Sequence, residues 1–476
     1  MKNNTKITPP SLDEGIITDP SKKRYILIVV GLATFFSAFI TTSITVALPT
    51  IADQFQIDAI IQTWIATIFL LAVAICSAPF GKISGRFGLK KFLNLGIITI
   101  ILACFGVAFA PSAEILLFFR AIQGVGSAMI SVSTVALISH AMPFKERGKA
   151  IGITISCVYI GLTLGPVVGG IITQNMGWQG MFLIIIPLLL INLILSYLKV
   201  DKEWKMGEKE PFDYVGTFLY SIGILLAIYG FTIINTFLGI ILTIFGLIVL
   251  GIFAKYELKQ INPVFEVKLF KNVKFTTATL VALISYLATF VVTYIITYHL
   301  QYIKGMDPQT SGIILIVTSG LMAIIAPFSG RLSDKIDPQK LSVIGMILVT
   351  ISVGILTFLN ETTPLYVVII AMALEGIGLG LFTSPNTNTI MSSVPRKFTS
   401  IASATVSTAR VIGQTLSLGM LTILFATIMG SVQIIPDIYP ELILTSQIAF
   451  GISTILCIIA VILSFVGVRT KSNLQG

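Results

Sequence analysis

GLTLGPVVGG, residues 161–170, lies inside a long apolar run that otherwise has the pattern of a helix. Glycine and proline cost about 1 and about 3 kcal/mol relative to alanine in a helix interior. Four glycines and a proline in one helix therefore need surroundings in which close backbone packing offsets that cost. The rest of the chain identifies those surroundings.

The composition is that of a membrane protein. Of 476 residues, 55% are hydrophobic and 11% are charged, whereas soluble domains carry about 25% charged residues. Apolar runs of about 20 residues recur from Tyr25 to Val468, and each can cross a hydrocarbon core of roughly 30 Å. We predict an all-α polytopic membrane protein with fourteen spans, at 25–48, 61–80, 92–110, 114–139, 149–173, 181–199, 213–234, 237–254, 275–299, 311–328, 340–359, 364–390, 400–430 and 442–468.

Positive charge indicates the orientation of these spans. With the N-terminus inside, nearly all of the 31 Lys and Arg residues fall in the tails or the inner loops. This follows the positive-inside rule, so the net charge of +10 reports topology rather than a nucleic-acid partner. We expect a multi-pass protein of the plasma membrane with both termini cytoplasmic. Residues 1–24 are polar and lack a cleavage site, so the first span should act as the insertion signal.

The residues of soluble enzymes and metal sites are scarce. The four cysteines fall within apolar spans without metal-ligand spacing, and the two histidines lie far apart in sequence. No Walker A pattern occurs, so ATP-driven pumping is not expected. We expect no metal, no cofactor and no enzymatic activity. The residues concerned are Cys76, Cys104, Cys157, Cys457, His140 and His299.

The chain repeats itself. RAIQGVGSAM at 120–129 aligns with MALEGIGLGL at 372–381, and the same offset aligns Gly161 with Gly413. Two six-span halves related by an axis along the membrane normal are a transporter architecture, with the substrate site between them near the midplane. We therefore predict tails at 1–24 and 469–476, pseudo-symmetric six-helix halves at 25–199 and 275–468, and a two-helix insert with flanking cytoplasmic loops at 200–274.

Two inner loops carry related motifs, GKISGRFGLKK at 81–91 and GRLSDKIDPQK at 330–340. Glycine permits a close turn, and the cations can meet helix C-termini or a carboxylate across the halves. Such pairs can hold an inner gate shut in one state and release it in the other. Plain topogenic charge is the alternative. The candidate gate residues are Gly81, Arg86, Gly88, Lys90, Lys91, Gly330, Arg331 and Asp334.

Two further motifs lie within spans. In LLFFRAIQGVGSA at 116–128, Arg120 lies about 10 Å below the outer surface, where an arginine is costly and usually faces the bundle interior. In the opening segment the glycines recur every four residues along one face, which lets helices touch backbone to backbone. A proline there bends the helix, which neighbouring helices can compensate. A generic packing face is the alternative. This segment's candidates are Gly161, Gly165, Pro166, Gly169 and Gly170.

Over nearly its whole length the chain resembles the major facilitator superfamily, and within it the fourteen-span drug:proton antiporter family. The resemblance implies rocker-switch alternating access, proton coupling and export, with the glycine face as a leak-tight interface between the halves. The matching motifs are the inner-loop motif at 81–91, the span-4 arginine motif at 116–128, the antiporter motif at 161–170, FDYVG at 212–216, HLQYIKG at 299–305 and SPNTNTIM at 384–391.

The chain departs from the family at two places. Gly85 stands where the inner-loop motif usually carries an acid, although Asp334 keeps that acid in the second half. Ile40 and Thr45 stand where the family usually has an aspartate and an asparagine before VALP. The first-span acid expected for proton or cation binding is therefore missing.

Glu375 is the best remaining proton carrier. It lies about eleven residues into its span, near the midplane at about 1.5 Å per residue, at the repeat position of Gln123. Burial there penalises the charged carboxylate and allows proton exchange near neutral pH. Arg410 lies about ten residues deep and can pair with Glu375 or act with it as a switch. A static Glu375–Arg410 pair is the alternative. The proton-coupling candidates are Glu375, Arg120 and Arg410.

These features predict proton-coupled efflux of amphipathic organic compounds, with the small molecule, protons and the bilayer as partners and a monomer as the working form. The alternatives are a transporter of an endogenous metabolite or anion bound by Arg120 and Arg410 without antiport, and a non-transporting sensor or scaffold. Depth alone nominates the polar groups of the cavity: Thr41, Thr45, Gln123, Asn386 and Gln414.

Overall fold

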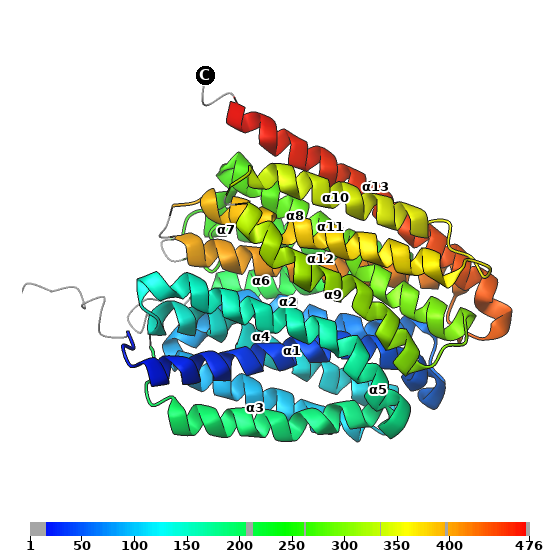
Figure 1. Ribbon diagram of the computed structural model, residues 1–476, viewed down its shortest axis with the longest axis horizontal. Coiled ribbons are helices and arrows are strands. Elements are labelled where there is room, and N and C mark those ends of the chain that lie inside the picture. The colour runs from blue at the N-terminus through cyan, green and yellow to red at the C-terminus, as the bar shows by residue number, and fades with distance from the viewer. Residues whose placement is uncertain (1–15, 206–212, 261–262, 334, 396–397, 473–476) are drawn as a thin grey trace, which may run out of the picture.

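The fold is a bundle of long helices that run nearly parallel (Figure 1). The computed structural model describes residues 16–205, 213–260, 263–333, 335–395 and 398–472, without the side chains of 144–145, 399–400 and 466–472. Its long helices are α1 Pro20–Phe55, α2 Ala59–Phe87, α3 Leu89–Ala108, α4 Ala113–Ala141, α5 Phe144–Lys199, α6 Tyr214–Thr232, α7 Phe237–Glu257, α8 Val273–Tyr298, α9 Pro308–Leu332, α10 Pro338–Leu356, α11 Leu365–Ser392, α12 Thr399–Leu424 and α13 Tyr439–Ser472. Short helical turns are η1 Val267–Lys271, η2 His299–Ile303, η4 Phe425–Met429 and η5 Pro436–Ile438.

Polar side chains set where several helices begin. The first backbone N–H groups of a helix have no partner within it, and an Asp or Asn side chain at the N-cap accepts one of them. Asp58 accepts from the amide of Ile61 at 2.8 Å, and Asp307 accepts from the amide of Thr310 at 2.9 Å. These caps place the start of α2 and of α9 within three residues of the predicted span starts.

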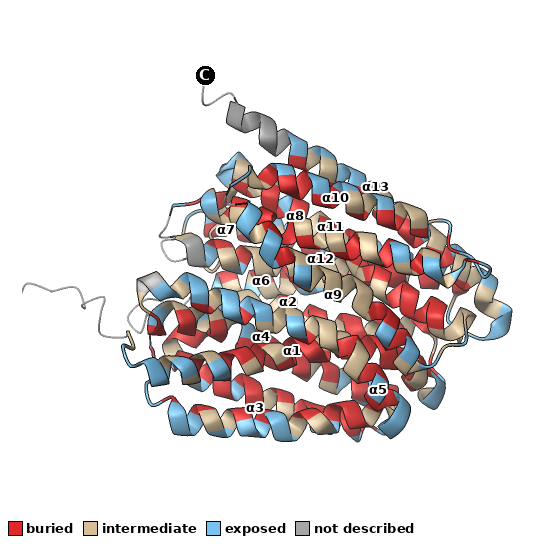
Figure 2. Ribbon diagram, in the orientation of Figure 1, coloured by how far each residue is buried: buried red, intermediate tan, exposed pale blue. Residues whose placement is uncertain are grey.

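Thirteen helices of the described chain are long and apolar enough to cross a bilayer. Large apolar side chains are exposed on the outer faces of the bundle, among them Phe105 of α3, Leu247 of α7 and Ile462 of α13. Figure 2 shows buried residues where helices face one another and exposed residues on the outward surfaces. Such a surface suits lipid, because hydrocarbon imposes no penalty on exposed apolar groups. The protein is therefore a multi-pass membrane protein.

The helix α5 contains two of the predicted spans. It has 56 residues, roughly 84 Å at the α-helical rise, far more than one crossing of a core of about 30 Å requires. Gly177 interrupts it with φ 74° and ψ 163°, a left-handed φ that glycine adopts without a steric penalty. The two arms of α5 match the spans expected at 149–173 and 181–199, and counting them separately gives fourteen candidate spans.

The helices pack in two sets. Helices α1 to α5 contact one another in the lower part of Figure 1, and α8 to α13 contact one another in the upper part. The sets meet where α5 contacts α9 and where α2 contacts α12. We call the end that holds the starts of α1, α3 and α5 the basic side, and the opposite end the far side. The division into domains at the predicted residue boundaries remains a prediction.

The glycine face lies mainly against its own half, which corrects the expected role of residues 161–170. A Cβ on Gly161 would lie 2.5 Å from the Phe35 carbonyl oxygen of α1, and Gly165 and Gly169 lie against the Thr42–Ser43 region of α1. The end of the motif packs on the other half: Gly170 lies against the backbone of Pro308, and Gly312 lies against that of Pro166. Thr163 also reaches the second half, because its hydroxyl donates to the Ser319 carbonyl of α9 at 3.2 Å. The motif therefore takes part in the interface between the halves, along the contact of α5 with α9.

Hydrogen bonds between the halves close the far side. The Gln301 side-chain amide in η2 donates to the Val46 carbonyl of α1 at 2.9 Å, and Gln62 of α2 donates to the Tyr302 hydroxyl at 3.1 Å. The amide of Ala59 donates to the Val432 carbonyl at 3.3 Å. These three hydrogen bonds join α1 and α2 of the first half to η2 and the segment after η4 of the second half, on the far side.

The inserted helices α6 and α7 join both halves. They pack against each other, and α6 contacts α2 of the first half and α12 of the second. The Tyr220 hydroxyl of α6 donates to the Ala74 carbonyl of α2 at 3.0 Å. Gly419 of α12 lies against Phe231 and Thr232 of α6. The insert therefore covers the seam where α2 meets α12.

The packing of α5 on α1 yields a stability prediction. We expect Gly161→Ala to destabilise the protein by about 1–3 kcal/mol, because the added methyl group collides with a backbone oxygen that cannot rotate away. Thermal unfolding in detergent measures the change. Gly152→Ala, in open space on the same helix, is the control and should be neutral or slightly stabilising. Equal effects of the two variants would contradict the packing described for Gly161.

The far-side hydrogen bonds yield a conformational prediction. We expect the double variant Gln301→Leu/Tyr302→Phe to raise the population with an open far side about fivefold or more, because it loses two hydrogen bonds made across the halves. Spin labels at the exposed residues Gln56 and Thr362 report the distance between the halves. Tyr366→Phe removes the same hydroxyl from an exposed position of α11 and should leave the distances unchanged. A double variant that behaves like this control would show that these bonds do not hold the far side shut.

Candidate functional site

A cavity opens between the halves on the basic side. It has a volume of about 470 Å³ and is bounded by the ends of α2 and α4 from the first half and by the start of α12 from the second. Asp213, Val264 and Phe265 of the insert complete its wall. Because the far side is closed and this side is hollow, the structure is open toward the basic side.

Small and hydroxyl-bearing side chains dominate the cavity wall. Such a lining suits an organic solute that makes apolar contact with a few hydrogen bonds. Three cationic side chains, Lys82, Arg86 and Arg410, line the cavity. Asp213 is the one carboxylate among the described residues of the wall, which on that count is net positive. The hydroxyl groups are those of Ser77 on α2, Ser131 and Ser139 on α4, and Ser403, Thr405, Ser407 and Thr408 on α12.

Arg120 lies inside the first half and does not line this cavity. Its side chain is fully buried, and its Nε donates to the Ile65 carbonyl at 3.0 Å. Its NH1 donates to Gln123 Oε1 at 2.8 Å, and its guanidinium carbon lies 4.6 Å from the centre of the Phe69 ring. One guanidinium nitrogen, NH2, has no partner among the described residues. Arg120 therefore ties α4 to α2.

Glu375 lies inside the second half. It is 3% exposed, and its nearest polar contact is the Thr318 hydroxyl of α9, which donates to it at 3.4 Å. Within the described part of the chain it makes no ion pair. A charged carboxylate with one long hydrogen bond and no cation is costly in such a place. The surroundings suit the neutral, protonated acid.

Arg410 is separate from Glu375. It lines the cavity from α12, close enough to Tyr159 and Tyr286 for electrostatic interaction with their hydroxyl groups. The static Glu375–Arg410 pair is not formed in this structure. The three proton-coupling candidates thus occupy three places: one within each half, and one at the cavity.

The five polar residues nominated by depth do not line the cavity. Thr41 bonds within α1, Gln123 holds Arg120, and Asn386 donates to the Ala278 carbonyl of α8 at 3.1 Å. Thr45 is 1% exposed, and Gln414 is half-buried on α12. Depth near the midplane does not place these residues on the cavity wall, because the open cavity is lined by the basic-side ends of α2, α4 and α12.

The first inner-loop motif divides between helix and cavity. Gly81 and Arg86 belong to the last turns of α2 and line the cavity, whereas Gly88, with φ 106°, makes the one-residue connection to α3. The backbone amides of Lys90 and Lys91 donate to the Glu203 carboxylate at 2.9 and 3.0 Å. The carboxylate at this loop therefore comes from the segment after α5 in the same half.

The second inner-loop motif stays within its own half. Gly330 lies against the Ser384 hydroxyl of α11, and Arg331 is exposed in the last turn of α9. Asn388 of α11 donates to the Ser333 hydroxyl at 2.6 Å. Asp334 lies outside the described residues. The gate role of these loops remains a prediction.

Two features of the site do not follow from the motifs identified in the sequence. Glu203 places a carboxylate against Gly88, Lys90 and Lys91 of the first loop motif, and no local pattern links it to a loop more than a hundred positions earlier. The hydroxyl-rich start of α12, SIASATVSTAR at 400–410, did carry a signal. Five hydroxyl residues within these eleven positions are unusual for a lipid-facing surface and indicate a face that meets water or solute.

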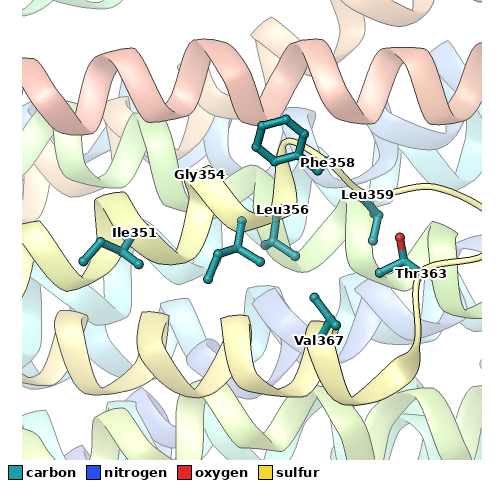
Figure 3. Close-up of a pocket in the computed structure, with 8 residues that line it drawn as sticks. Ile351, Gly354, Leu356, Phe358, Leu359, Thr363 and Val367 are labelled. Atoms are coloured by element: carbon teal, nitrogen blue, oxygen red, sulfur yellow. The ribbon is translucent and has the colours of Figure 1, made fainter.

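A second hollow, of about 490 Å³, lies on the far side between α10 and α11. Figure 3 shows apolar side chains, among them Ile351, Phe358 and Val367, around it. Thr363 supplies its only polar side chain, and Phe358 is 78% exposed. With no charge and one hydroxyl, this groove offers little to orient a polar solute, so the cavity on the basic side is the candidate site.

The described residues do not contain a cluster of three His, Cys, Asp or Glu side chains that could hold a metal.

Comparisons with known proteins agree with this architecture. The family model of the Major Facilitator Superfamily matches residues 30–418 and 278–475. The riboflavin transporter RibZ of Clostridioides difficile is 28% identical over 446 residues, 93% of this chain and 97% of that protein. The multidrug resistance protein Stp of Mycobacterium tuberculosis is 26% identical over 404 residues, 83% of this chain and 74% of that protein.

Among solved structures, a bacterial homologue of the human lysosomal transporter Spinster superposes with a TM-score of 0.68 at 15% identity, over 95% of this chain and 98% of that one. This likeness shows a shared fold. The resemblance expected from the motifs is thereby confirmed, with relatives that include named drug-resistance proteins. The chain belongs to the major facilitator superfamily and is a membrane transporter rather than an enzyme.

Proposed function

We propose that the protein exports amphipathic organic compounds in exchange for protons. The observation that carries this proposal is the cavity open to the basic side, whose apolar and hydroxyl lining suits such solutes. Glu375, a buried carboxyl group that makes no ion pair within the described part of the chain, supplies the proton site. Relatives named for multidrug resistance support it.

The exchange proceeds as the halves alternate. With the basic side open, substrate enters the cavity between α2, α4 and α12. When the far side opens, a proton reaches Glu375 and the substrate leaves. Glu375 does not line the cavity in the present state, so proton release needs a movement of α9 or α11 that breaks the contact with Thr318. The basic side faces the cytoplasm of a plasma-membrane protein, and a monomer is sufficient.

The first prediction concerns Glu375→Gln. The amide keeps the shape and the hydrogen bond of the acid but cannot exchange a proton, so substrate-driven proton movement should fall at least tenfold. Purified protein in sealed liposomes with an internal pH dye and an imposed proton gradient measures it, with cationic, neutral and anionic amphiphiles as substrates.

Glu361→Gln makes the same chemical change in an exposed segment on the far side and should retain the wild-type rate. Substrate flux without proton movement in the wild-type protein would overturn the antiport proposal. Full proton coupling in Glu375→Gln would place the carrier elsewhere. Absence of flux for every compound would favour a sensor or scaffold.

One observation favours a second function. The cavity wall is net positive, and Arg410 stands on it without an ion pair among the described residues. A guanidinium group in such a place suits an anionic or electron-rich planar metabolite, through charge-assisted hydrogen bonds or stacking. The relative named riboflavin transporter makes riboflavin and its phosphate the natural compounds to test.

Arg410→Gln separates the two functions. If Arg410 binds an anionic metabolite, the substitution should raise the KM for riboflavin phosphate about tenfold to a hundredfold. That factor corresponds to the free energy of one hydrogen bond to a charged group. The KM for neutral amphiphiles should barely change. Uptake of labelled compound into inverted membrane vesicles gives both constants, and Arg24→Gln, on an exposed residue of α1, is the control. An unchanged KM for riboflavin phosphate would remove Arg410 from substrate binding.

A further inference from the structure

A pair of carboxyl groups lies where the two inserted helices end on the basic side. Asp213 caps α6 by accepting from the amide of Gly216 at 2.7 Å, and it lines the cavity. Glu257 is the last residue of α7 and is 1% exposed. The two side chains meet at Gly216, where a Cβ would lie 2.4 Å from an oxygen of each. Neither group has a place in the transport cycle proposed above.

Each carboxyl group keeps one oxygen without a partner. Asp213 Oδ1 accepts from the Gly216 amide and from the Tyr256 hydroxyl, and Glu257 Oε2 accepts from the amide of Phe265 at 3.4 Å. The other oxygens, Asp213 Oδ2 and Glu257 Oε1, are buried and unpartnered among the described residues. Both lie against the Cα of Gly216, where a side chain would collide with each.

Two adjacent buried acceptors need a donor between them. Neither carboxylate makes an ion pair with Lys or Arg in the described part of the chain. A divalent cation prefers six or more oxygen ligands, whereas this place offers two carboxylates and no described cluster of three. A proton needs only the two oxygens, since a protonated carboxyl donates to the carboxylate beside it. Two facing carboxylates resist joint ionisation, which favours the same arrangement.

We propose that Asp213 and Glu257 form a second protonation site, in which one proton is shared between the two carboxyl groups at the mouth of the cavity. A proton from cavity water binds one of the facing oxygens, and the new O–H donates to the other. The pair then carries one negative charge instead of two. The insert, which also covers the seam where α2 meets α12, thereby gains a chemical role.

The pair stands in a charged setting. Tyr256 and Lys255 lie on α7 itself, and Glu266 follows Phe265 in the adjoining segment. Lys82 and Arg86 of α2, His140 of α4 and Arg410 of α12 line the same cavity as Asp213. Loss of the shared proton therefore adds a negative charge to a net positive wall. Because α6 contacts both α2 and α12, that change acts where the halves meet.

Infrared difference spectroscopy tests the shared proton without any transport assay. The carbonyl stretch of a protonated carboxyl is separated from that of a carboxylate, and titration of purified protein reveals it. Glu375→Gln serves as the parent, so that the other buried acid is silent. We expect a protonated carboxyl at neutral pH in this parent, and its loss in Glu375→Gln/Glu257→Gln and in Glu375→Gln/Asp213→Asn.

These substitutions should preserve the fold. Asparagine caps a helix as well as aspartate does, and a glutamine at 257 can donate to Asp213. Glu361→Gln in the same parent should leave the band unchanged. A band that survives both Glu257→Gln and Asp213→Asn overturns the proposal, as does a parent without such a band at neutral pH.

The role of the pair in transport rests on the proposed proton coupling. The existence of the shared proton does not depend on that coupling. With Glu375 intact, Glu257→Gln should keep antiport but displace the pH dependence of its rate by about one pH unit or more. If Glu375→Gln retains coupling while the band still requires Glu257, the antiport mechanism fails and the shared proton stands. If the band does not change on substitution of Glu257 while Glu375→Gln abolishes coupling, the shared proton is disproved and the antiport mechanism stands.

Discussion

Backbone contact through glycine is the constraint on which this bundle depends. Lipid offers helices no hydrophobic reason to associate, so packing distance decides how well they hold together. Gly161 brings α5 onto α1 in the first half, and Gly413, its repeat partner, lies against the Leu283 carbonyl of α8 in the second. Gly126 and Gly378 likewise bring α4 onto α3 and α11 onto α10. The helix propensity lost at each glycine is offset by contact that no larger residue permits.

The buried charges follow from the same surroundings. Arg120 donates hydrogen bonds to the Ile65 carbonyl and to the Gln123 side chain, and these bonds hold its guanidinium group in place between α4 and α2. Glu375 occupies the repeat position of Gln123, yet among the described residues it makes no ion pair with an arginine. The two halves thus have the same architecture but differ at this repeat position, where Gln123 accepts a hydrogen bond from an arginine and Glu375 accepts one from Thr318. An acid with few partners can exchange a proton at little structural cost, whereas an arginine with many cannot move cheaply.

Much of the fold followed from the sequence. Apolar length located the spans to within a few residues, because hydrocarbon thickness dictates helix length. Helices such as α2 continue past the predicted end, to Phe87, since their backbone bonds persist where side chains turn polar. The opening motif packs mainly on α1 and only in part across the halves, because a glycine face specifies close contact without specifying the neighbour. Cavity residues were missed for a related reason: depth along a helix does not say which way the protein is open.

The position of the insert has a consequence for how a compound reaches the cavity. A transporter made of two halves has two seams that face the lipid, one on either flank. Here α6 covers the seam between α2 and α12, and Tyr220 and Phe231 fix it to each side. A compound dissolved in the membrane that approaches along that flank meets a wall of helix. Lateral entry from the lipid would therefore have to use the opposite flank, where no helix of the described residues covers the contact between α5 and α9 as α6 covers the other seam.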